Sequence, residues 1–414
     1  MKKESVLISK AAGISVAELF QAQAIKTPRA LAIINSNGDK YTYKNFLLRV
    51  LKLSTVLIKR GVKPKDRIAI FSENRFEYLE LEMACAKIGA IVTAINWRLS
   101  DKEADYCINL VKPKITFFSE RFKNKIKLRA IKSLPSIIYG LKYENLIDKA
   151  ISYSGPSLGF GEDILVILFT SGTTGNPKGA KISHRAFVAR TMYWTYEYKV
   201  NQEDTFPAWA PMFHMASTDL AIGSLIIGAS VAFIDGFQPK VLKSLIQKYK
   251  LSWLVLMPGM LEGFIKFLNG KKIKIKGIKA MGAMADLIPK NQIIEITTLL
   301  DTSYLNSFGS TETGMPPASG GVIDKNSKNF SLSKTQSSFC EVILVNDNKT
   351  VELGFSGECA VRGPTLFSGY WKAEETNLKD FKNGWFHMGD VMKRNIDGTL
   401  SLIHISEPTR QEAI

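Results

Sequence analysis

Short apolar runs alternate with longer helix-like segments, and this alternation is the strongest constraint on the fold. In the first part of the chain, strand-like runs at 66–71, 90–94 and 115–118 are separated by helix-like segments at 77–88 and 101–110. Strands that alternate with helices in this order form a parallel sheet covered by helices on both faces. The alternation therefore predicts an α/β fold.

A second series of the same kind begins at Asp163. Its first run, at 164–169 (ILVILF), is wholly apolar, as expected for a central strand buried on both faces. A helix near Ser183 follows, then strands expected at 231–235, 252–257, 277–282 and 303–308 and helices at 241–249, 260–268 and 289–299. Because 414 residues exceed what one hydrophobic core usually serves, we expect two tandem parallel-sheet subdomains, at about 15–160 and 161–335.

From about Cys340 the pattern changes to short strand-like runs separated by Gly and Asn, at 340–345, 357–362, 385–388 and 400–403. Such runs indicate a small β-rich subdomain, which we place at 336–403. Residues 1–403 would then form one large domain of three subdomains, followed by a tail at 404–414.

The composition is that of a globular protein, and its charge pattern limits the classes of partner that we expect. Hydrophobic residues make up 45% of the chain, and the net charge is +17. The basic residues are scattered, and the densest run, 271–279 (KKIKIKGIK), alternates with Ile as a strand with one wet face would. We therefore expect no nucleic-acid partner, and DNA binding stays a distant alternative that rests on the charge alone.

The cysteines and the apolar segments indicate a cytoplasmic protein. Cys85, Cys107, Cys340 and Cys359 form no C-x-x-C pair, so we expect reduced, buried thiols without a zinc site or disulfides. The longest uncharged run, 220–234, is shorter than a bilayer span and predicts a buried helix followed by a strand. The N-terminus does not resemble a signal peptide, and peripheral membrane contact stays open.

Residues 170–179 (TSGTTGNPKG) combine three glycines, four hydroxyl side chains and one lysine directly after an apolar run. Glycines let a backbone approach a ligand closely, and N–H groups, hydroxyls and an ammonium neutralise phosphate oxygens. The Walker sequence does not fit, because Pro177 stands where its second glycine should be. A surface turn would not require this composition, so we predict a polyphosphate-binding loop between a buried strand and a helix.

This loop resembles a motif of the adenylate-forming enzyme superfamily, which includes acyl-CoA synthetases, nonribosomal peptide adenylation domains and beetle luciferases. Further family-like motifs follow in the family's order, at 211–215 (PMFHM), 306–314 (NSFGSTETG), 357–364 (GECAVRGP) with 369–371 (GYW), and 384–390 (GWFHMGD). Segments 61–67 (GVKPKDR) and 96–99 (NWRL) also resemble acyl-CoA synthetases. The resemblance covers about 15–403 and implies the fold of an acyl-CoA synthetase N-terminal domain.

The resemblance implies an acid–thiol ligase reaction in two halves. A carboxylate oxygen attacks the α-phosphorus of ATP and gives acyl-AMP and pyrophosphate; the thiol of CoA then attacks the acyl carbon and AMP leaves. The first half needs neutralised phosphates, a Mg²⁺ ion and a fixed nucleophile. We therefore expect ATP, Mg²⁺ and CoA to act on a small-molecule carboxylic acid, and the oligomeric state stays open.

The resemblance also implies roles for single residues. The loop would hold the β- and γ-phosphates through Thr170, Ser171, Gly172, Thr173, Thr174, Gly175 and Lys178. Thr311 would contact the α-phosphate, Glu312 would bind Mg²⁺, and Asp390 would take both ribose hydroxyls. Phe308, in place of the family's usual Tyr, would stack on adenine, and the rest of the nucleotide site would be formed by Gly282, Ala283, Met284 and Gly309.

His214 would gate the reacting carboxylate. Amino-acid-activating relatives tend to carry Asp here to hold the amine, so His favours an acid without an amine, and we expect a fatty acid. The segment 220–227, with Met212, Met215 and Trp194, would line an acyl tunnel, although core packing explains these residues equally. Two alternatives stay open: an enzyme that activates aryl or amino acids, and a non-catalytic nucleotide-binding or scaffold protein.

The end of the chain departs from the family. In the family a hinge, typically Asp-Arg-x-Lys, leads into a C-terminal cap domain that carries a catalytic lysine. Here His404 and Ile405 stand where Asp and Arg would be expected. We therefore expect a chain that is truncated before the cap domain, with an atypical tail and impaired activity.

Overall fold

The structure, a computed structural model of the chain, describes residues 2–35, 37–170, 176–271, 273–347 and 349–404. The chain divides into two compact units. Unit 1 comprises Met1–Thr191, Asn201–Phe237 and Phe367–Lys372, and unit 2 comprises Met192–Val200, Gln238–Leu366 and Ala373–Ile414. Helices and parallel strands occur in both units, which confirms the predicted α/β class. The subdomain boundaries expected near 160 and 335 stay predictions.

Unit 1 contains a mostly parallel sheet with the strand order β6-β5-β3-β4-β7-β8. Neighbouring strands run parallel up to β7, and β8 is antiparallel to β7. The central strands β3, β4, β5 and β7 are rich in buried apolar side chains, as a sheet covered on both faces requires. The strands are β3 (Arg67–Phe71), β4 (Ile91–Ala94), β5 (Ile115–Phe118), β6 (Ser136–Ile138), β7 (Ile164–Thr170) and β8 (Lys178–Ser183).

A second, shorter set of strands in unit 1 runs parallel in the order β9-β10-β1, and β2 pairs antiparallel with β1. These strands are β1 (Leu31–Ile34), β2 (Lys40–Thr42), β9 (Asp204–Ala208) and β10 (Ser230–Phe233). The helices that begin in unit 1 are α1 (Lys2–Ala11), α2 (Val16–Lys26), α3 (Tyr43–Lys59), α4 (Phe76–Ile88), α5 (Asp101–Val111), η1 (Glu120–Lys127), α6 (Leu141–Lys149), α7 (His184–Tyr198) and α8 (Met215–Ile227).

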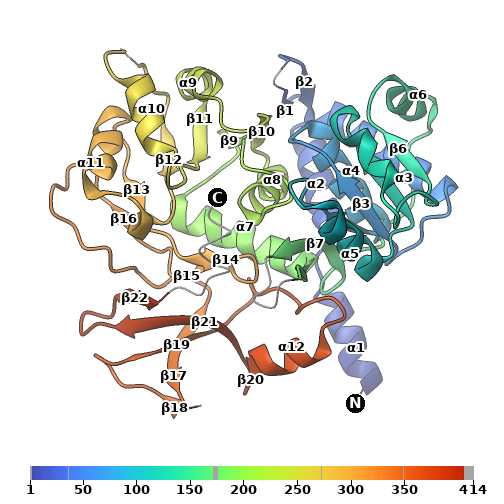
Figure 1. Cartoon of the computed structure of the whole chain (residues 1–414). Coiled ribbons are helices and arrows are strands. Elements are labelled where there is room, and N and C mark those ends of the chain that lie inside the picture. Colours follow the sequence, from blue (N-terminus) through green and yellow to red (C-terminus); the bar gives the residue numbers. More distant parts are fainter. Residues whose placement is uncertain (1, 36, 171–175, 272, 348, 405–414) are drawn as a thin grey trace. The chain divides into compact units, whose positions relative to one another are not determined.

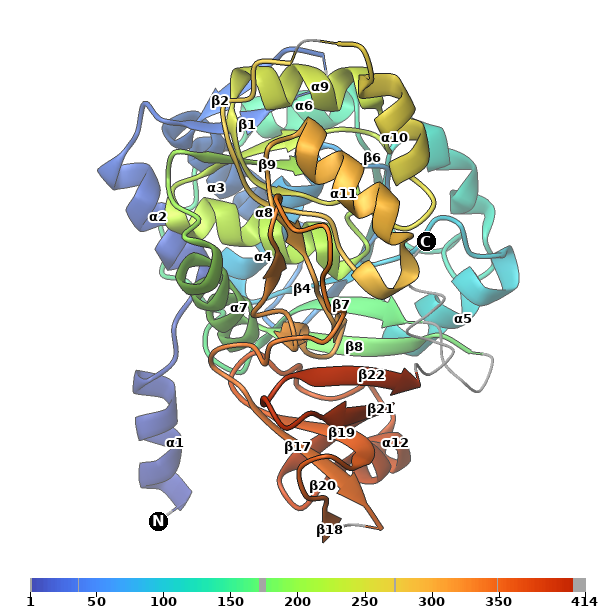
Figure 2. The ribbon, with the colours of Figure 1, turned by 90° about the vertical axis from the view of Figure 1, so that its left-hand side faces the viewer.

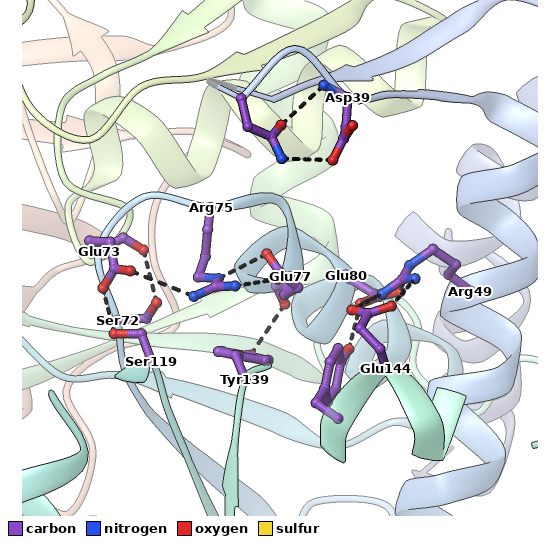
Figure 3. Close-up of polar contacts among 12 residues, drawn as sticks. Asp39, Arg49, Ser72, Glu73, Arg75, Glu77, Glu80, Ser119, Tyr139 and Glu144 are labelled. Atoms are coloured by element: carbon purple, nitrogen blue, oxygen red, sulfur yellow. Dashed lines mark hydrogen bonds and ion pairs between the residues drawn. The ribbon is translucent and has the colours of Figure 1, made fainter. Parts of the chain in front are cut away.

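Helix α4 is buried along its whole length although it carries charged residues. It contacts β4 and β7 as well as α2, α3 and α8. Glu80 of this helix receives hydrogen bonds from Arg49, which also binds Glu144 (Figure 3). Such pairing is what makes a buried charge tolerable. Glu82 lies two residues further along the same helix. It is fully buried and contacts the hydroxyl of Thr218 instead.

Unit 2 carries a parallel set of strands in the order β11-β12-β13, with β16 antiparallel to β13. These strands are β11 (Lys250–Leu254), β12 (Ile278–Met281), β13 (Tyr304–Leu305) and β16 (Val322–Ile323). A small hairpin, β14 (Gly309–Ser310) with β15 (Gly314–Pro317), follows β13. The accompanying helices are α9 (Pro239–Lys248), α10 (Leu261–Leu268), η2 (Ala285–Leu287) and α11 (Lys290–Leu299).

The last part of unit 2 is an antiparallel sheet, coloured orange to red in Figure 1. Its order is β18-β17-β19-β21-β20, and β22 also pairs with β21. The predicted β-rich region therefore exists. Its elements are β17 (Glu341–Asn346), β18 (Lys349–Thr350), β19 (Ser356–Arg362), α12 (Glu374–Asp380), β20 (Phe381–Lys382), β21 (Trp385–Arg394) and β22 (Leu400–His404).

Two local predictions were wrong. The loop that begins after Thr170 leads into strand β8, not directly into a helix, because residues from Lys178 onward pair with β7. In the run 271–279 only the last residues join a strand, β12, and Gly277 adopts φ +131°, which few side chains tolerate. The described Lys side chains there (271, 274, 276 and 279) are exposed and the Ile side chains are half-buried, so the alternation reflects partial burial and not a paired strand along the whole run.

The other sequence expectations concern cysteines and membranes. All four cysteines are free; Cys85, Cys107 and Cys359 are buried, and Cys340 is half-buried. The run 220–234 forms most of α8 and then β10, as predicted. Within the part of the chain that the structure describes, the helices lack the combination of length and apolar character needed to cross a bilayer.

Candidate functional site

The predicted phosphate loop joins two antiparallel strands, which run side by side in Figure 2. Thr170 ends β7 and Lys178 begins β8, and these two residues face each other in the pairing register. Thr170 is buried, and Nζ of Lys178 lies 5.1 Å from the centroid of the Tyr370 ring. Five predicted phosphate ligands lie outside the described residues, namely Ser171, Gly172, Thr173, Thr174 and Gly175.

The segment that contains the Gly-Tyr-Trp motif extends this hairpin. The N–H of Lys181 donates to the carbonyl of Gly369 over 3.0 Å, and the N–H of Trp371 donates to the carbonyl of Gly179 over 2.8 Å. A Cβ at Gly179 would lie 2.9 Å from Ile167 Cγ2, closer than side chains pack. Two motifs that are far apart in the sequence therefore meet in unit 1, and the glycine permits the approach.

Asn74 holds the turn that leads to His214. Its side-chain amide donates to the carbonyls of Ala208 and Ala210, over 2.9 Å and 2.6 Å, and accepts from the N–H of Met212 over 2.9 Å. One buried amide thus satisfies three backbone groups at the end of β9. The sequence analysis missed Asn74, because an isolated Asn carries no signal for such a distant contact.

A buried polar network supports the first turn of α8. His214 is the residue before the helix, and its Nδ1 accepts a hydrogen bond of 3.2 Å from the N–H of Ala216, as an N-cap does. The hydroxyl of Thr218 donates to the carbonyl of Met212, and Oε1 of Glu82 lies 3.4 Å from the same hydroxyl. Burial raises the pKa of Glu82 well above its usual value, which favours the neutral, protonated form of this carboxyl.

An aromatic cluster lies beside this turn. The ring of Trp97 meets Phe213 edge-on at 6.0 Å and stacks on Phe122 at 5.2 Å between centroids. The guanidinium groups of Arg98 and Arg121 lie 5.1 Å and 5.3 Å from the Trp97 ring, within cation–π range. The segments 96–99 and 211–215, both identified by resemblance, are therefore neighbours in unit 1.

In unit 2, the segment from Gly282 to Met284 is tied to the residues that follow β13. Gly282 adopts φ +82°, and a Cβ there would lie 2.1 Å from Cζ of Tyr304. The Tyr304 hydroxyl is 3.1 Å from the carbonyl of Ala283, and the N–H of Met284 donates to Oγ of Ser307 over 3.1 Å. The two predicted adenine segments are thus held against each other by side-chain hydrogen bonds.

The motif at 306–314 folds into the β14–β15 hairpin. The N–H of Phe308 donates to the carbonyl of Ala318 over 3.0 Å. A Cβ at Gly309 would lie only 2.1 Å from the carbonyl oxygen of Gly314, so only glycine fits. The turn between the strands carries Thr311 and Glu312, which are 3% and 9% exposed. A nearly buried acid at a tight turn is more restrained than a solvated loop acid.

Asp390 lies at an irregular position of β21. The pairing of β21 with β19 shifts register in this stretch, and Gly389 adopts φ +81°. The N–H of Gly389 donates to Oε1 of Glu358 over 3.1 Å, while Oε2 of Glu358 lies 3.0 Å from Nδ1 of His387. Asp390 is 1% exposed. The bulge therefore turns this carboxylate inward, as bulges near functional sites often do.

The acidic residues of the candidate site are compatible with a metal ion that binds together with the nucleotide. Among the described residues, no group of three or more His, Cys, Asp or Glu side chains could hold a metal ion by itself. Mg²⁺ commonly takes one or two protein carboxylates together with phosphate oxygens and water. A single restrained carboxylate such as Glu312 is compatible with that arrangement.

The predicted site residues are distributed over both units. Thr170, Lys178 and His214 belong to unit 1, and the described ligands assigned to adenosine, α-phosphate and metal belong to unit 2, namely Gly282, Ala283, Met284, Phe308, Gly309, Thr311, Glu312 and Asp390. Met212 and Met215 belong to unit 1, whereas Trp194 belongs to unit 2 and meets Trp253 at 6.2 Å. The individual roles stay predictions.

Comparisons with a family model and with curated proteins agree on one family. A model of the family described as AMP-binding enzyme matches residues 20–371. Among curated proteins, feruloyl-CoA synthase from an Amycolatopsis species is 25% identical over 92% of this chain and 76% of its own length. The medium-chain fatty-acid–CoA ligase of Escherichia coli is 24% identical over 94% of this chain and 72% of its own length.

The fold has close counterparts among solved structures. The inhibitor-bound N-terminal domain of FACL13 from Mycobacterium tuberculosis superposes with a TM-score of 0.85 at 21% identity, over 94% of this chain and all of that one. At this identity the likeness speaks for the fold alone. It agrees with the α/β class and the antiparallel β region predicted from the sequence.

Proposed function

The chain belongs to the AMP-binding enzyme family, and from this premise we propose that it activates a fatty acid with ATP. Its relatives are acid–CoA ligases that differ in the acid they take. In the proposed reaction a carboxylate oxygen forms a bond to the α-phosphorus, the bond from that phosphorus to pyrophosphate breaks, and acyl-AMP results. The thiol of CoA then displaces AMP and forms the thioester.

One observation carries the proposal: the hydrogen-bonded junction between residues 282–284 and 304–308 in unit 2. Phe308 is the aromatic ring of this junction and is assigned to adenine stacking. Asp390 is assigned to the two ribose hydroxyls, which a carboxylate accepts from at once. Thr311 is assigned to the α-phosphate, where negative charge grows as the carboxylate attacks.

The remaining phosphates and the metal complete the assignment. Thr170, Lys178 and the five loop residues between 171 and 175 are assigned to the β- and γ-phosphates. Glu312 is assigned to Mg²⁺, whose chemistry is to neutralise phosphate charge as pyrophosphate leaves. His214 is assigned to the carboxylate of the substrate. Its position as N-cap of α8 holds the imidazole at the start of a helix whose later part, 220–227, is small and mostly apolar.

An aryl acid is a second candidate substrate, favoured by the aromatic cluster beside His214. Trp97 and Phe213 present flat rings in the segment next to the assigned carboxylate gate. Rings of this kind prefer aromatic partners in offset or edge-on contact. Relatives named for both substrate classes match this chain about equally well.

The test uses stable mimics of acyl-AMP, in which a sulfamate replaces the phosphate. Dodecanoyl-, octanoyl- and feruloyl-sulfamoyl adenosine are titrated calorimetrically into the 414-residue chain, with sulfamoyl adenosine as reference. We expect a fatty acyl group to tighten binding at least about 10-fold, the worth of a partly buried apolar chain. Tighter binding of the feruloyl mimic would select the aryl alternative, and no gain from any acyl group would overturn the proposal.

A variant of Glu312 separates the metal from the nucleotide. Glu312→Gln should weaken binding of MgATP roughly 10-fold or more, because a carboxylate ligand is lost. It should leave the metal-free sulfamoyl mimics unaffected. Glu352→Gln, which changes an exposed acid, serves as control. Equal loss for MgATP and for the mimics would remove Glu312 from the metal.

A further inference from the structure

Lys334 is a fully buried lysine in a stretch that carries none of the motifs. Its side chain has 0% exposure, and lysine is almost never fully buried unless it is paired. Its backbone is fixed as well, because its N–H and carbonyl exchange hydrogen bonds of 2.7 Å and 2.8 Å with Leu400 of β22. The side chain therefore reaches inward from an anchored position in unit 2.

The ammonium of Lys334 joins the two segments assigned to adenine. Its Nζ lies 2.5 Å from Oδ2 of Asp286 and 2.6 Å from Oδ1 of Asn306. Asp286 belongs to η2, directly after Met284. Asn306 stands two positions before Phe308. A single cation thus connects the chain that follows β12 to the chain that follows β13.

The orientation of Asn306 is fixed by its other contacts. Its Nδ2 donates to the carbonyls of Leu332 and Ser333, each over 3.0 Å, so its Oδ1 must face Lys334. The N–H of Asn306 also donates to the carbonyl of Gly321 over 3.3 Å. All polar atoms of this side chain are therefore used, which leaves Asn306 a single arrangement while Lys334 is present.

Asp286 keeps the lysine charged. Burial lowers the pKa of Lys334, and the nearby carboxylate of Asp286 opposes that shift. Asp286 itself is only partly buried, so it retains some solvation. Without the ammonium, Asp286 would lose its partner and Asn306 Oδ1 would face an empty space at the junction of the two segments.

We propose that Lys334 is a positioning residue for nucleotide binding, which fixes residues 282–286 against residues 306–308 so that the adenine slot is preformed. The inference rests on the proposed function, since it assumes that adenine lies between these segments. It assigns Lys334 no contact with the nucleotide. A ligand slot that must be ordered at the moment of binding loses affinity by the cost of that ordering.

The test measures the affinity for AMP by calorimetry in wild type, Lys334→Met and the double variant Lys334→Met with Asp286→Leu. The double variant removes both charges and keeps apolar volume, so that its thermal stability returns toward wild type while Asn306 stays unanchored. We expect AMP affinity to fall roughly 10- to 100-fold in both variants. A merely structural role would restore affinity together with stability.

A matched ion pair provides the control. Lys325 binds Asp301 over 2.6 Å, but the two side chains are 38% and 76% exposed, so Lys325→Met should leave AMP affinity unchanged. Wild-type affinity in the double variant would overturn the positioning role and leave the proposed function standing. A folded wild-type chain that does not bind AMP would overturn the proposed function, and the positioning role would fall with it.

Discussion

Two buried ionisable side chains support the segments assigned to function. One is a neutral acid and the other is a cation. Glu82, in unit 1, lies under the turn at 211–215 as a neutral acid, and among the described residues no basic side chain forms an ion pair with it. Lys334, in unit 2, lies under the segments assigned to adenine as a cation paired with Asp286. Each side chain forms a hydrogen bond with a residue far away in the sequence: Glu82 with Thr218, and Lys334 with Asn306.

The difference shows what each position requires of its residue. Glu82 only has to fill space and accept a long hydrogen bond of 3.4 Å from the Thr218 hydroxyl, which also donates to the carbonyl of Met212. Lys334 has to supply charge to Asp286 and two donors in a fixed geometry. A neutral side chain of equal shape that carries an acceptor oxygen should therefore replace Glu82, whereas the loss of the Lys334 charge leaves a carboxylate uncompensated.

The largest expected effect on stability comes from the removal of the Lys334 charge. Lys334→Met should lower the free energy of unfolding by about 4 kcal/mol, because removing one partner of a buried pair strands the other. Urea denaturation monitored by tryptophan fluorescence measures this. Lys325→Met, which breaks an exposed pair, should cost no more than about 0.5 kcal/mol. Similar losses for the two variants would remove the special status of Lys334.

The next largest effect on stability is expected from glycine-to-alanine substitutions, which test how tightly the supported segments are packed. Gly282→Ala should cost about 3 kcal/mol, since its Cβ would enter the Tyr304 ring. Gly259 has the same φ of +82° with open space around it, so Gly259→Ala measures backbone strain alone, at about 1 kcal/mol. In α8, a Cβ at Gly223 would first meet the side chain of Thr191, 2.9 Å from its Oγ1, and helix propensity should offset most of the crowding in Gly223→Ala. Equal costs for Gly282→Ala and Gly259→Ala would contradict the tight junction.

The protonation of Glu82 gives a pH-dependent effect of intermediate size. The folded state keeps a proton that the unfolded chain releases above about pH 4.3, so the wild type loses stability as pH rises. Glu82→Gln cannot titrate. As pH rises above the unfolded pKa, it should gain stability relative to wild type at about 1.4 kcal/mol per pH unit for as long as Glu82 stays protonated in the fold.

The nearby groups do not confound this comparison. Asp219 and Arg190 face the same region and form a buried pair of 2.9 Å, which is present in both chains. Glu352→Gln, at an exposed acid, should run parallel to wild type. Parallel stability curves for wild type and Glu82→Gln above the unfolded pKa would show that Glu82 is ionised in the fold.

The smallest effects concern single hydroxyl groups on each side. Thr218→Val removes the hydrogen bond to Met212, and Ser307→Ala removes the one to Met284. Each should cost about 1 kcal/mol, the usual worth of one buried hydrogen bond. Thermal unfolding of the two variants, with Ser331→Ala as an exposed control, checks the estimate. A cost several times larger at either site would mean that the hydroxyl orders a whole segment.

The sequence predicted elements wherever local pattern decides structure. The apolar run of β7 and the α4 segment appear where the pattern indicated them, whereas the strand expected at 303–308 is confined to Tyr304–Leu305 and is followed by the β14–β15 hairpin. Strand β8 was missed, because its first residues, Lys178 and Gly179, look like loop residues until β7 and Trp371 pair with them. Pairing of that kind depends on residues distant in sequence, which no local window contains.

The support of the candidate site was out of reach of sequence reasoning for the same reason. Lys334 sits among Ser, Thr and Gln residues that suggest an exposed loop, and its burial depends on Asp286 and Asn306. Glu82 looks like a solvent-facing position of an amphipathic helix, yet α4 is covered on every side. Motifs identified the residues assigned to ligand contact, whereas the residues that hold them carry no motif.

The most direct test of the account is photolabelling of the chain with an azido derivative of AMP, followed by peptide mapping. Labelling should fall on peptides that contain residues 282–284 or Phe308, and excess AMP should abolish it. Label concentrated on other peptides, with equal protection by AMP, would contradict the assignment of the nucleotide to the junction that Lys334 holds together.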